Sequence, residues 1–191
     1  MKPIILASTS PRRKEIMAKL GLEFETVSSD YEEDMSLELA PLELAKILSA
    51  GKAEAVATRY TDHVIIAADT FIALDNEVLG KPHTEDNAAK MLKKISGRPI
   101  SVITGYTIID TSADKKLSKA IETKVYIKEL SEEEINGYIK TGEPLDRAGA
   151  FAAQDLGAVI VEKIDGDFFN VMGLPLFHLS ESLKEFGINI F

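Results

Sequence analysis

The chain has 191 residues, of which 45% are hydrophobic and 28% charged, a composition typical of a globular protein with one large domain or two small lobes. Its formal net charge of −9 argues against a nucleic-acid partner, which would need a broad basic face, and it has no cysteine for disulfides, thiolate catalysis or metal binding. No apolar run approaches membrane-spanning length and no signal-peptide pattern opens the chain, so we expect a cytoplasmic protein with no membrane partner.

The N-terminal segment predicts a strand, a helix and a second strand. The apolar run Ile4–Ala7 is typical of a buried strand, and a small polar turn follows it. Pro11 suits the first position of a helix, because a proline lacks the amide hydrogen that would stay unpaired there, and Gly21 is a plausible end. Glu23–Val27 alternates in polarity and predicts the second strand.

A long helix and a buried strand come next. Apolar residues recur at spacings of three and four over Pro41–Tyr60, which predicts a helix. Lys52 lies near its apolar stripe, an unexpected place for a lysine that is only solvated, while Gly51 either weakens the helix or permits a close backbone approach. The continuous apolar run Val64–Ala68 predicts a strand covered on both faces, ending at Asp69.

The remaining pattern predicts strands, helices and a hairpin. In chain order these are an extended segment Phe71–Leu74, a loop Leu79–Pro82, a helix from Thr84 to Ile95, a hairpin of Ile100–Ile109 and Leu117–Ile127, a capped helix from Ser131 to Gly142, a loop to Asp155, a strand Ala158–Ile164, a short strand Phe168–Met172 and a closing helix Pro175–Phe186. Helices and strands that alternate before a hairpin predict an α/β domain with a mixed sheet. No repeat or composition break divides residues 1–191, so we expect a single domain.

Two adjacent arginines mark a candidate anion site. Arg12 and Arg13 fall in the first turn of the first predicted helix, where the helix dipole disfavours cations. An anion there would meet backbone amides, two hydroxyls and two guanidiniums together. The alternative is an ordinary solvated basic turn. The working hypothesis is a phosphate site at residues 8–13.

Acidic and lysine residues supply the rest of a candidate site. Asp69 ends a buried strand, where ligands bind in open α/β sheets, and could hold a divalent ion or deprotonate water, or could only cap a turn. Glu33 in the acidic loop Asp30–Asp34 could add a second carboxylate, although such loops are usually only solvated. Lys81 has a backbone constrained by its glycine and proline neighbours and could face a phosphate. Together these groups suit metal-assisted attack of water on a phosphoanhydride.

Short motifs along the whole chain resemble those of the Maf family. They are LASTSPRRKEI from residue 6, the acid at Glu33, Lys52 with Ala53, AADT at 67–70, GKP at 80–82, SGR at 96–98, TGY at 104–106, GEPLDRAGAFAAQ at 142–154 and GLPL at 173–176. Each motif is short, but their joint occurrence in this order is highly specific.

The resemblance implies a fold, a reaction and site residues. The fold is the elongated Maf/inosine-triphosphatase-like α/β fold, with a mixed twisted sheet, helices on both sides and a cleft between two lobes. The reaction is cleavage of a nucleoside triphosphate between its α- and β-phosphates with a divalent metal cation (Mg²⁺, Mn²⁺ or Co²⁺), and a homodimer is compatible with it. Asp69 corresponds to the proton acceptor and Glu33 to a second acid near the metal. The residues that match phosphate-binding and catalytic positions are Ser8, Ser10, Arg12, Arg13, Lys52 and Lys81.

Three positions associated with substrate choice resemble the branch that acts on dTTP, UTP and 5-modified uridine nucleotides. They are Arg12, Thr70 and Gln154. A Gln offers a donor and an acceptor to the N3–H and carbonyl edge of uracil, whereas a Glu would accept the donors of guanine. The chain departs from many members of this branch at Phe151–Ala153 and at Asp155. Two alternatives stay open: specificity for 7-methyl-GTP, and a nucleotide-binding regulator of septum formation without turnover.

Overall fold

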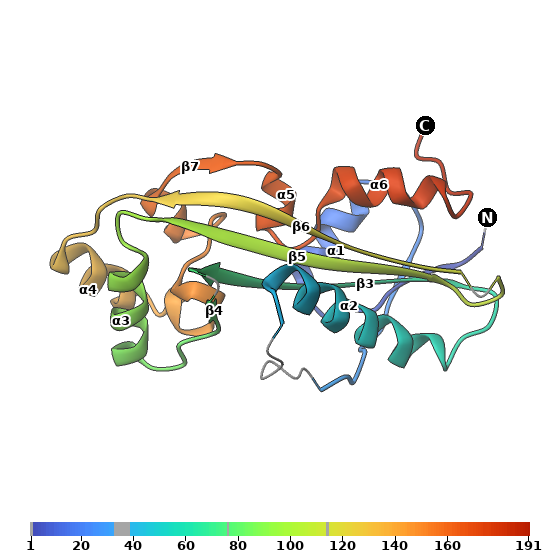
Figure 1. Ribbon diagram of the computed structural model, residues 1–191, viewed down its shortest axis with the longest axis horizontal. Coiled ribbons are helices and arrows are strands. Elements are labelled where there is room, and N and C mark those ends of the chain that lie inside the picture. The colour runs from blue at the N-terminus through green and yellow to red at the C-terminus, as the bar shows by residue number, and fades with distance from the viewer. Residues whose placement is uncertain (1, 33–38, 76, 114) are drawn as a thin grey trace. The chain divides into compact units, whose positions relative to one another are not determined.

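The computed structural model describes residues 2–32, 39–75, 77–113 and 115–191 (Figure 1). The elements follow in the order β1 (Ile4–Leu6), α1 (Pro11–Ala18), β2 (Glu25–Thr26), α2 (Pro41–Ala57), β3 (Val64–Leu74), β4 (Glu77–Leu79), α3 (Glu85–Ile95), β5 (Pro99–Asp110), β6 (Lys115–Ile127), α4 (Glu132–Lys140), the 3₁₀ helices η1 (Glu143–Asp146), η2 (Ala148–Ala150) and η3 (Leu156–Ile160), β7 (Val161–Asp165), α5 (Phe168–Val171) and α6 (Leu176–Lys184). Within these ranges, no helix combines the length and the apolar character needed to cross a membrane.

All the described strands belong to one mixed sheet. Their order is β2-β1-β3-β5-β6-β7, with β4 paired to β3. β1 runs parallel to β2 and β3, whereas the β3–β4 and β6–β7 pairs are antiparallel. β5 and β6 are neighbours joined by residues 111–114, too few for the crossover that a parallel pair requires. The α/β class and the mixed sheet predicted from the sequence are confirmed.

The chain divides into two compact units. Unit 1 consists of Met1–Thr70, Thr104–Ile121 and Phe169–Phe191, and unit 2 of Phe71–Ile103 and Glu122–Phe168. Unit 1 therefore contains β1, β2, α1, α2 and α6, and unit 2 contains β4, α3, α4, β7 and the 3₁₀ helices.

Helices cover both faces of the sheet in unit 1. Successive side chains of a strand point to opposite faces. Alternate residues of β1 and β3, such as Leu6 and Ile66, pack in one apolar cluster with α1 and α6. The intervening residues, such as Ile65 and Ala67, pack in a second cluster with α2. Figure 1 shows α1 and α6 on one side of these strands and α2 on the other. The side chains that follow along β3 therefore also alternate between the face covered by α2 and the face covered by α1 and α6.

Two glycines allow close contacts with α2. A Cβ on Gly105 of β5 would lie 2.0 Å from the carbonyl oxygen of Ala45, so only glycine permits this strand to lie so near the helix. A Cβ on Gly51 would lie 2.3 Å from the ring of Tyr31. Of the two predicted reasons for Gly51, the close approach is the one observed, although the partner is a ring rather than a backbone.

Unit 2 is built around two capped helices that pack against each other and against 3₁₀ turns. The Thr84 side chain accepts a hydrogen bond from the Asn87 amide at the start of α3. Ser131 and Glu134 form a complete capping box at the start of α4. Both starts were predicted from these residue types, and both are confirmed.

Three local predictions were wrong, and a fourth was right only in part. Phe168–Met172 was predicted as a short strand, but α5 is a helical turn. The strand predicted over Ala158–Ile164 begins only at Val161, because η3 precedes it. Leu79 was predicted in a loop but ends β4, which pairs with β3 in antiparallel register. Glu23–Val27 is a strand only over Glu25–Thr26.

Candidate active site

A buried ion pair connects β3 to α2 in unit 1. Asp69 was predicted at the end of a strand, but β3 continues to Leu74, so Asp69 lies within the strand. It follows Ala67 by two residues, so its side chain points to the α2 face of the sheet. Lys52 faces it from α2, and its ammonium donates a hydrogen bond to Asp69 Oδ1. The two side chains are only 11% and 8% exposed. Lys52 and Asp69, both predicted as site residues, are thus brought together in a poorly solvated position where each charge depends on the other.

A chain of hydrogen bonds surrounds Thr70 on the opposite face of the sheet. Arg13 of α1 donates from Nη2 to Thr70 Oγ1 at 3.2 Å and from Nε to the carbonyl oxygen of Gly173 at 3.0 Å. The Thr70 and Thr104 hydroxyl oxygens are 2.9 Å apart, and Thr104 donates to the carbonyl oxygen of Asn170 at 2.9 Å. Arg13 is therefore joined directly to Thr70, the residue that the resemblance associates with substrate choice.

The predicted anion loop turns sharply before α1. The Ser8 hydroxyl is buried and accepts a hydrogen bond from the Ser10 amide at 3.2 Å. Ser10 is the N-cap of α1 without a side-chain cap, Pro11 opens the helix, and the first turn has no acidic residue. Arg12 is half-buried in that turn. Hydroxyls, a helix N-terminus and arginines therefore occur together, as an anion site requires.

Lys81 and Gln154 belong to unit 2. Lys81 donates to Asp146 Oδ1 of η1 at 2.7 Å, and the two side chains are 50% and 80% exposed. This hydrogen bond from Lys81 holds the pKa of Asp146 below its ordinary value. Gln154 is half-buried in the turn between η2 and η3, next to Asp155, whose carboxylate accepts from Arg147 at 3.2 Å.

The predicted metal ligands fall partly outside the described residues. Glu33 lies there, so the structure says nothing of it. Within the described ranges, no group of three or more His, Asp and Glu residues is arranged so that it could hold a metal ion. Asp69 offers a hard carboxylate oxygen, and Mg²⁺ commonly takes one or two carboxylates with the remaining ligands from phosphates and water. The donor chemistry of Asp69 therefore fits a metal that arrives with the substrate.

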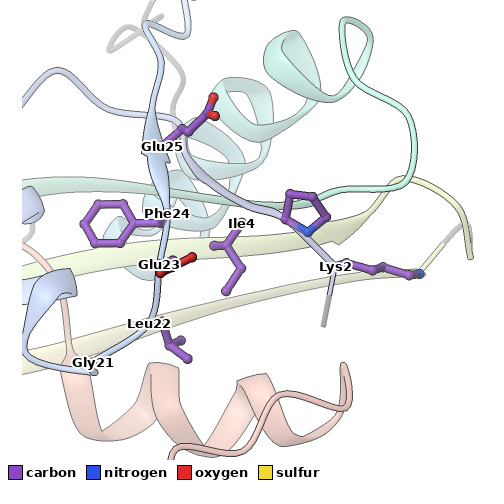
Figure 2. A pocket seen from close by; sticks show the side chains of 8 residues that line it. Lys2, Ile4, Gly21, Leu22, Glu23, Phe24 and Glu25 are labelled. Carbon is purple, nitrogen blue, oxygen red and sulfur yellow. The ribbon is translucent and has the colours of Figure 1, made fainter.

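A cavity of about 600 Å³ in unit 1 is lined by none of the predicted site residues that the structure describes. Its walls come from the start of β1 and the segment before β2, with Ile4, Leu22 and Phe24 as apolar side chains (Figure 2). Lys2, Glu23 and Glu25 add charges of both signs. The space has no set of converging groups that would suit the predicted chemistry.

The sequence did not reveal the partners of the predicted residues. Thr104, Gly173 and Asp146 all lie in motifs quoted for the family resemblance, but nothing in those motifs assigned them a contact. Thr104 and Gly173 support Thr70 and Arg13, and Asp146 pairs with Lys81. The sequence signal that could have pointed to these three residues was their occurrence in the TGY, GLPL and GEPLD segments of the resemblance.

Comparisons with known proteins agree over the whole chain. A family model described as "Maf-like protein" matches residues 3–186. A dTTP/UTP pyrophosphatase of Methanococcoides burtonii is 50% identical over 192 residues, covering 100% of this chain and 98% of the relative. One of Alkaliphilus oremlandii is 46% identical, covering 100% of both chains. A solved HAM1 protein from Coxiella burnetii aligns with a TM-score of 0.54 at 19% identity, covering 97% of this chain and 100% of that one, which is a likeness of fold alone.

Proposed function

The chain belongs to the Maf family, and on this premise we propose that it is a nucleoside triphosphate pyrophosphatase that hydrolyses dTTP and UTP, with 5-modified uridine nucleotides as further substrates. The observation that carries the proposal is the full-length identity of 46–50% to relatives named dTTP/UTP pyrophosphatase. The products would be the nucleoside monophosphate and pyrophosphate, so the protein would remove surplus or modified pyrimidine nucleotides from the cytoplasmic pool.

We propose that Asp69 accepts the proton of the attacking water. Its contact with Lys52 fixes the carboxylate in orientation, as a general base requires. An ammonium has three donors, so Lys52 can hold Asp69 and a phosphate oxygen at the same time. As negative charge grows on the phosphate in the transition state, the contact from Lys52 would strengthen.

The phosphates would be bound by the turn before α1. Ser8 and Ser10 offer hydroxyls, and Arg12 and Arg13 offer guanidiniums whose planar donors match phosphate oxygens. Lys81 of unit 2 is the further cation proposed for this role. Asp69 and Glu33 are the proposed metal ligands, and a bound Mg²⁺, Mn²⁺ or Co²⁺ would neutralise phosphate charge and favour attack on phosphorus.

Base choice is proposed to depend on Arg12, Thr70 and Gln154. The amide of Gln154 can pair with the N3–H and a carbonyl of uracil or thymine. Replacing Arg12 by Trp should lower kcat/KM for dTTP and UTP by a factor on the order of 10–100, as expected for loss of a charge-assisted contact. Unchanged kinetics for Arg12→Trp would show that Arg12 does not contact the substrate.

The test of the proposed function is a panel of nucleoside triphosphates assayed for pyrophosphate and orthophosphate with Mg²⁺, Mn²⁺ or Co²⁺. We expect pyrophosphate from dTTP and UTP, loss of activity on chelation, and its return when metal is restored. Orthophosphate as the only product would refute cleavage between the α- and β-phosphates. A preference for 7-methyl-GTP would reassign the substrate, and nucleotide binding without turnover would favour a regulatory protein. Light scattering of the same sample tests the homodimer.

A further inference from the structure

A tyrosine and a glutamate in unit 2 converge on the turn that carries Gln154. Tyr138 is buried on α4, and its hydroxyl donates to Glu143 Oε1 at 2.6 Å. Glu143 opens η1 directly after Gly142, whose φ of 76° lies in the left-handed region that glycine favours. The chain therefore reverses after α4 so that the Glu143 side chain returns to the helix it has just left.

The same two side chains hold three backbone amides on both sides of Gln154. The Leu156 amide donates to Glu143 Oε2 and the Gly157 amide to Oε1, each at 2.9 Å. On the other side, the Ala152 amide donates to the Tyr138 hydroxyl oxygen at 3.3 Å. Hydrogen bonds to a carboxylate are about twice as strong as those between neutral groups. The turn 152–157 is therefore fastened at both of its ends to one Tyr–Glu pair.

Packing around Gly157 shows how tightly this turn is closed. A Cβ at Gly157 would lie 2.4 Å from the Tyr138 hydroxyl oxygen and 2.8 Å from the Ala152 amide nitrogen. The backbone at 157 therefore lies against the hydroxyl with no space for a methyl group. Arg147 adds a lateral contact to Asp155, the residue directly after Gln154, at 3.2 Å.

The protonation states agree with this geometry. Burial raises the pKa of Glu143, but the hydrogen bonds from Tyr138, Gly157 and Leu156 outweigh it, so the pKa lies below its ordinary value and the carboxylate is charged at neutral pH. Burial and the hydrogen bond to Glu143 raise the pKa of Tyr138. The tyrosine thus stays a donor and the glutamate an acceptor.

We propose that Tyr138 and Glu143 are positioning residues for base recognition, which fix the turn 152–157 and thereby orient the Gln154 amide toward the pyrimidine. This inference rests on the proposed function, because it takes Gln154 as the residue that contacts the base. In this arrangement, neither the Tyr138 nor the Glu143 side chain contacts the reacting phosphates. Their loss would therefore weaken binding and selection of the base more than the rate at saturation.

Tyr138→Phe, Glu143→Gln and Gly157→Ala each disturb the pair in a different way. Tyr138→Phe removes the hydroxyl donor. Glu143→Gln replaces one carboxylate oxygen by an amide NH₂ group, a donor that would face a donor. Gly157→Ala adds a methyl group that displaces the backbone from the Tyr138 hydroxyl and removes no polar group. Ser131→Ala is the matched control, because it removes the cap at the other end of α4 and leaves the pair intact.

Hydrogen exchange in the free protein and steady-state kinetics give two separate measurements. We expect exchange to accelerate about tenfold at the Leu156 and Gly157 amides in Glu143→Gln and Gly157→Ala, and at the Ala152 amide in Tyr138→Phe, as for loss of one hydrogen bond, and not in Ser131→Ala. With UTP and CTP as substrates, we expect KM for UTP to rise about tenfold, kcat to stay within about threefold, and the preference for UTP over CTP to shrink.

The inference is overturned if exchange or base preference is unchanged in the variants, or if Ser131→Ala shifts base preference as much as they do. Lack of pyrophosphate release by the unaltered protein would refute the proposed function instead. In that case, the exchange measurement would still decide whether Tyr138 and Glu143 hold the turn.

Discussion

Two of the lysine–aspartate pairs in the described residues include a lysine proposed to bind phosphate, and these two pairs differ in solvent exposure. In unit 1, Lys52 and Asp69 are 11% and 8% exposed, whereas in unit 2 Lys81 and Asp146 are 50% and 80% exposed. A buried charge that loses its partner retains its desolvation cost, while an exposed charge is rehydrated. The ion pair therefore fixes the position of Lys52 in unit 1, whereas in unit 2 it contributes little to the position or charge of Lys81.

The largest expected difference is catalytic, and the same substitution in each pair tests it. Asp69→Asn should lower kcat for UTP by a factor on the order of 10³, the usual loss when a general base is removed. Asp146→Asn, the matched control, should change kcat by less than about threefold, since a solvated lysine keeps its charge without it. Similar losses in both variants, measured by pyrophosphate release, would refute the distinction between the pairs.

The second difference is in stability. Lys52→Met should lower the free energy of unfolding by about 3 kcal/mol, because it leaves the Asp69 carboxylate buried without its cation. Lys81→Met should cost less than about 1 kcal/mol. Urea denaturation measures both changes. The double variant Lys52→Met/Asp69→Leu should recover most of the loss, and a double variant as unstable as Lys52→Met would mean that packing, not charge, dominates.

The third difference concerns acid pH and the exposed pair. The hydrogen bond from Lys81 lowers the pKa of Asp146 in the folded state relative to an ordinary value of 3.8. The stabilisation of the folded state by the Lys81–Asp146 pair is therefore complete above about pH 4, and it is lost as pH falls through the folded-state pKa of Asp146. We expect Asp146→Asn to cost about 0.5 kcal/mol or less at pH 6 and nothing at the acid limit. A deficit that persists in acid would point to another cause.

The smallest expected effect is the response to salt. Raising ionic strength from about 0.1 M to 1 M shortens the screening length from about 10 Å to about 3 Å, which acts mainly on solvated charges. The small deficit of Asp146→Asn should vanish at high salt, while that of Lys52→Met should change little. Equal salt sensitivity in denaturation experiments would place both pairs in the same dielectric environment.

Local sequence signals were sufficient where a residue and its role lie on the same element. The apolar runs of β1 and β3, Pro11 at the start of α1 and the capping box of α4 were all predicted and are confirmed. Lys52 was notable because it stood near an apolar stripe, and it is indeed buried. These signals depend on side chains within a few positions of one another, which a sequence displays directly.

The predictions that failed depended on contacts between distant segments. Three of the four residues 168–171 are the strand-favouring types Phe and Val, yet the segment forms a helical turn whose Asn170 carbonyl accepts from Thr104 of β5. Glu143 accepts from the Leu156 and Gly157 amides at the start of η3, and this 3₁₀ helix includes Ala158–Ile160, so β7 begins at Val161 instead of at Ala158. Here partners supplied by the fold overrode local propensity.

The sequence by itself determined the family, the alternation of strands and helices, and the identities of the proposed site residues. The tertiary structure decided which of them meet. Asp69 and Thr70 are neighbours in the chain, yet the pleat of β3 sends Asp69 to Lys52 on α2 and Thr70 to Arg13 on α1. That separation exists only once helices cover both faces of the sheet, because each partner lies 17 or 57 positions away in the chain.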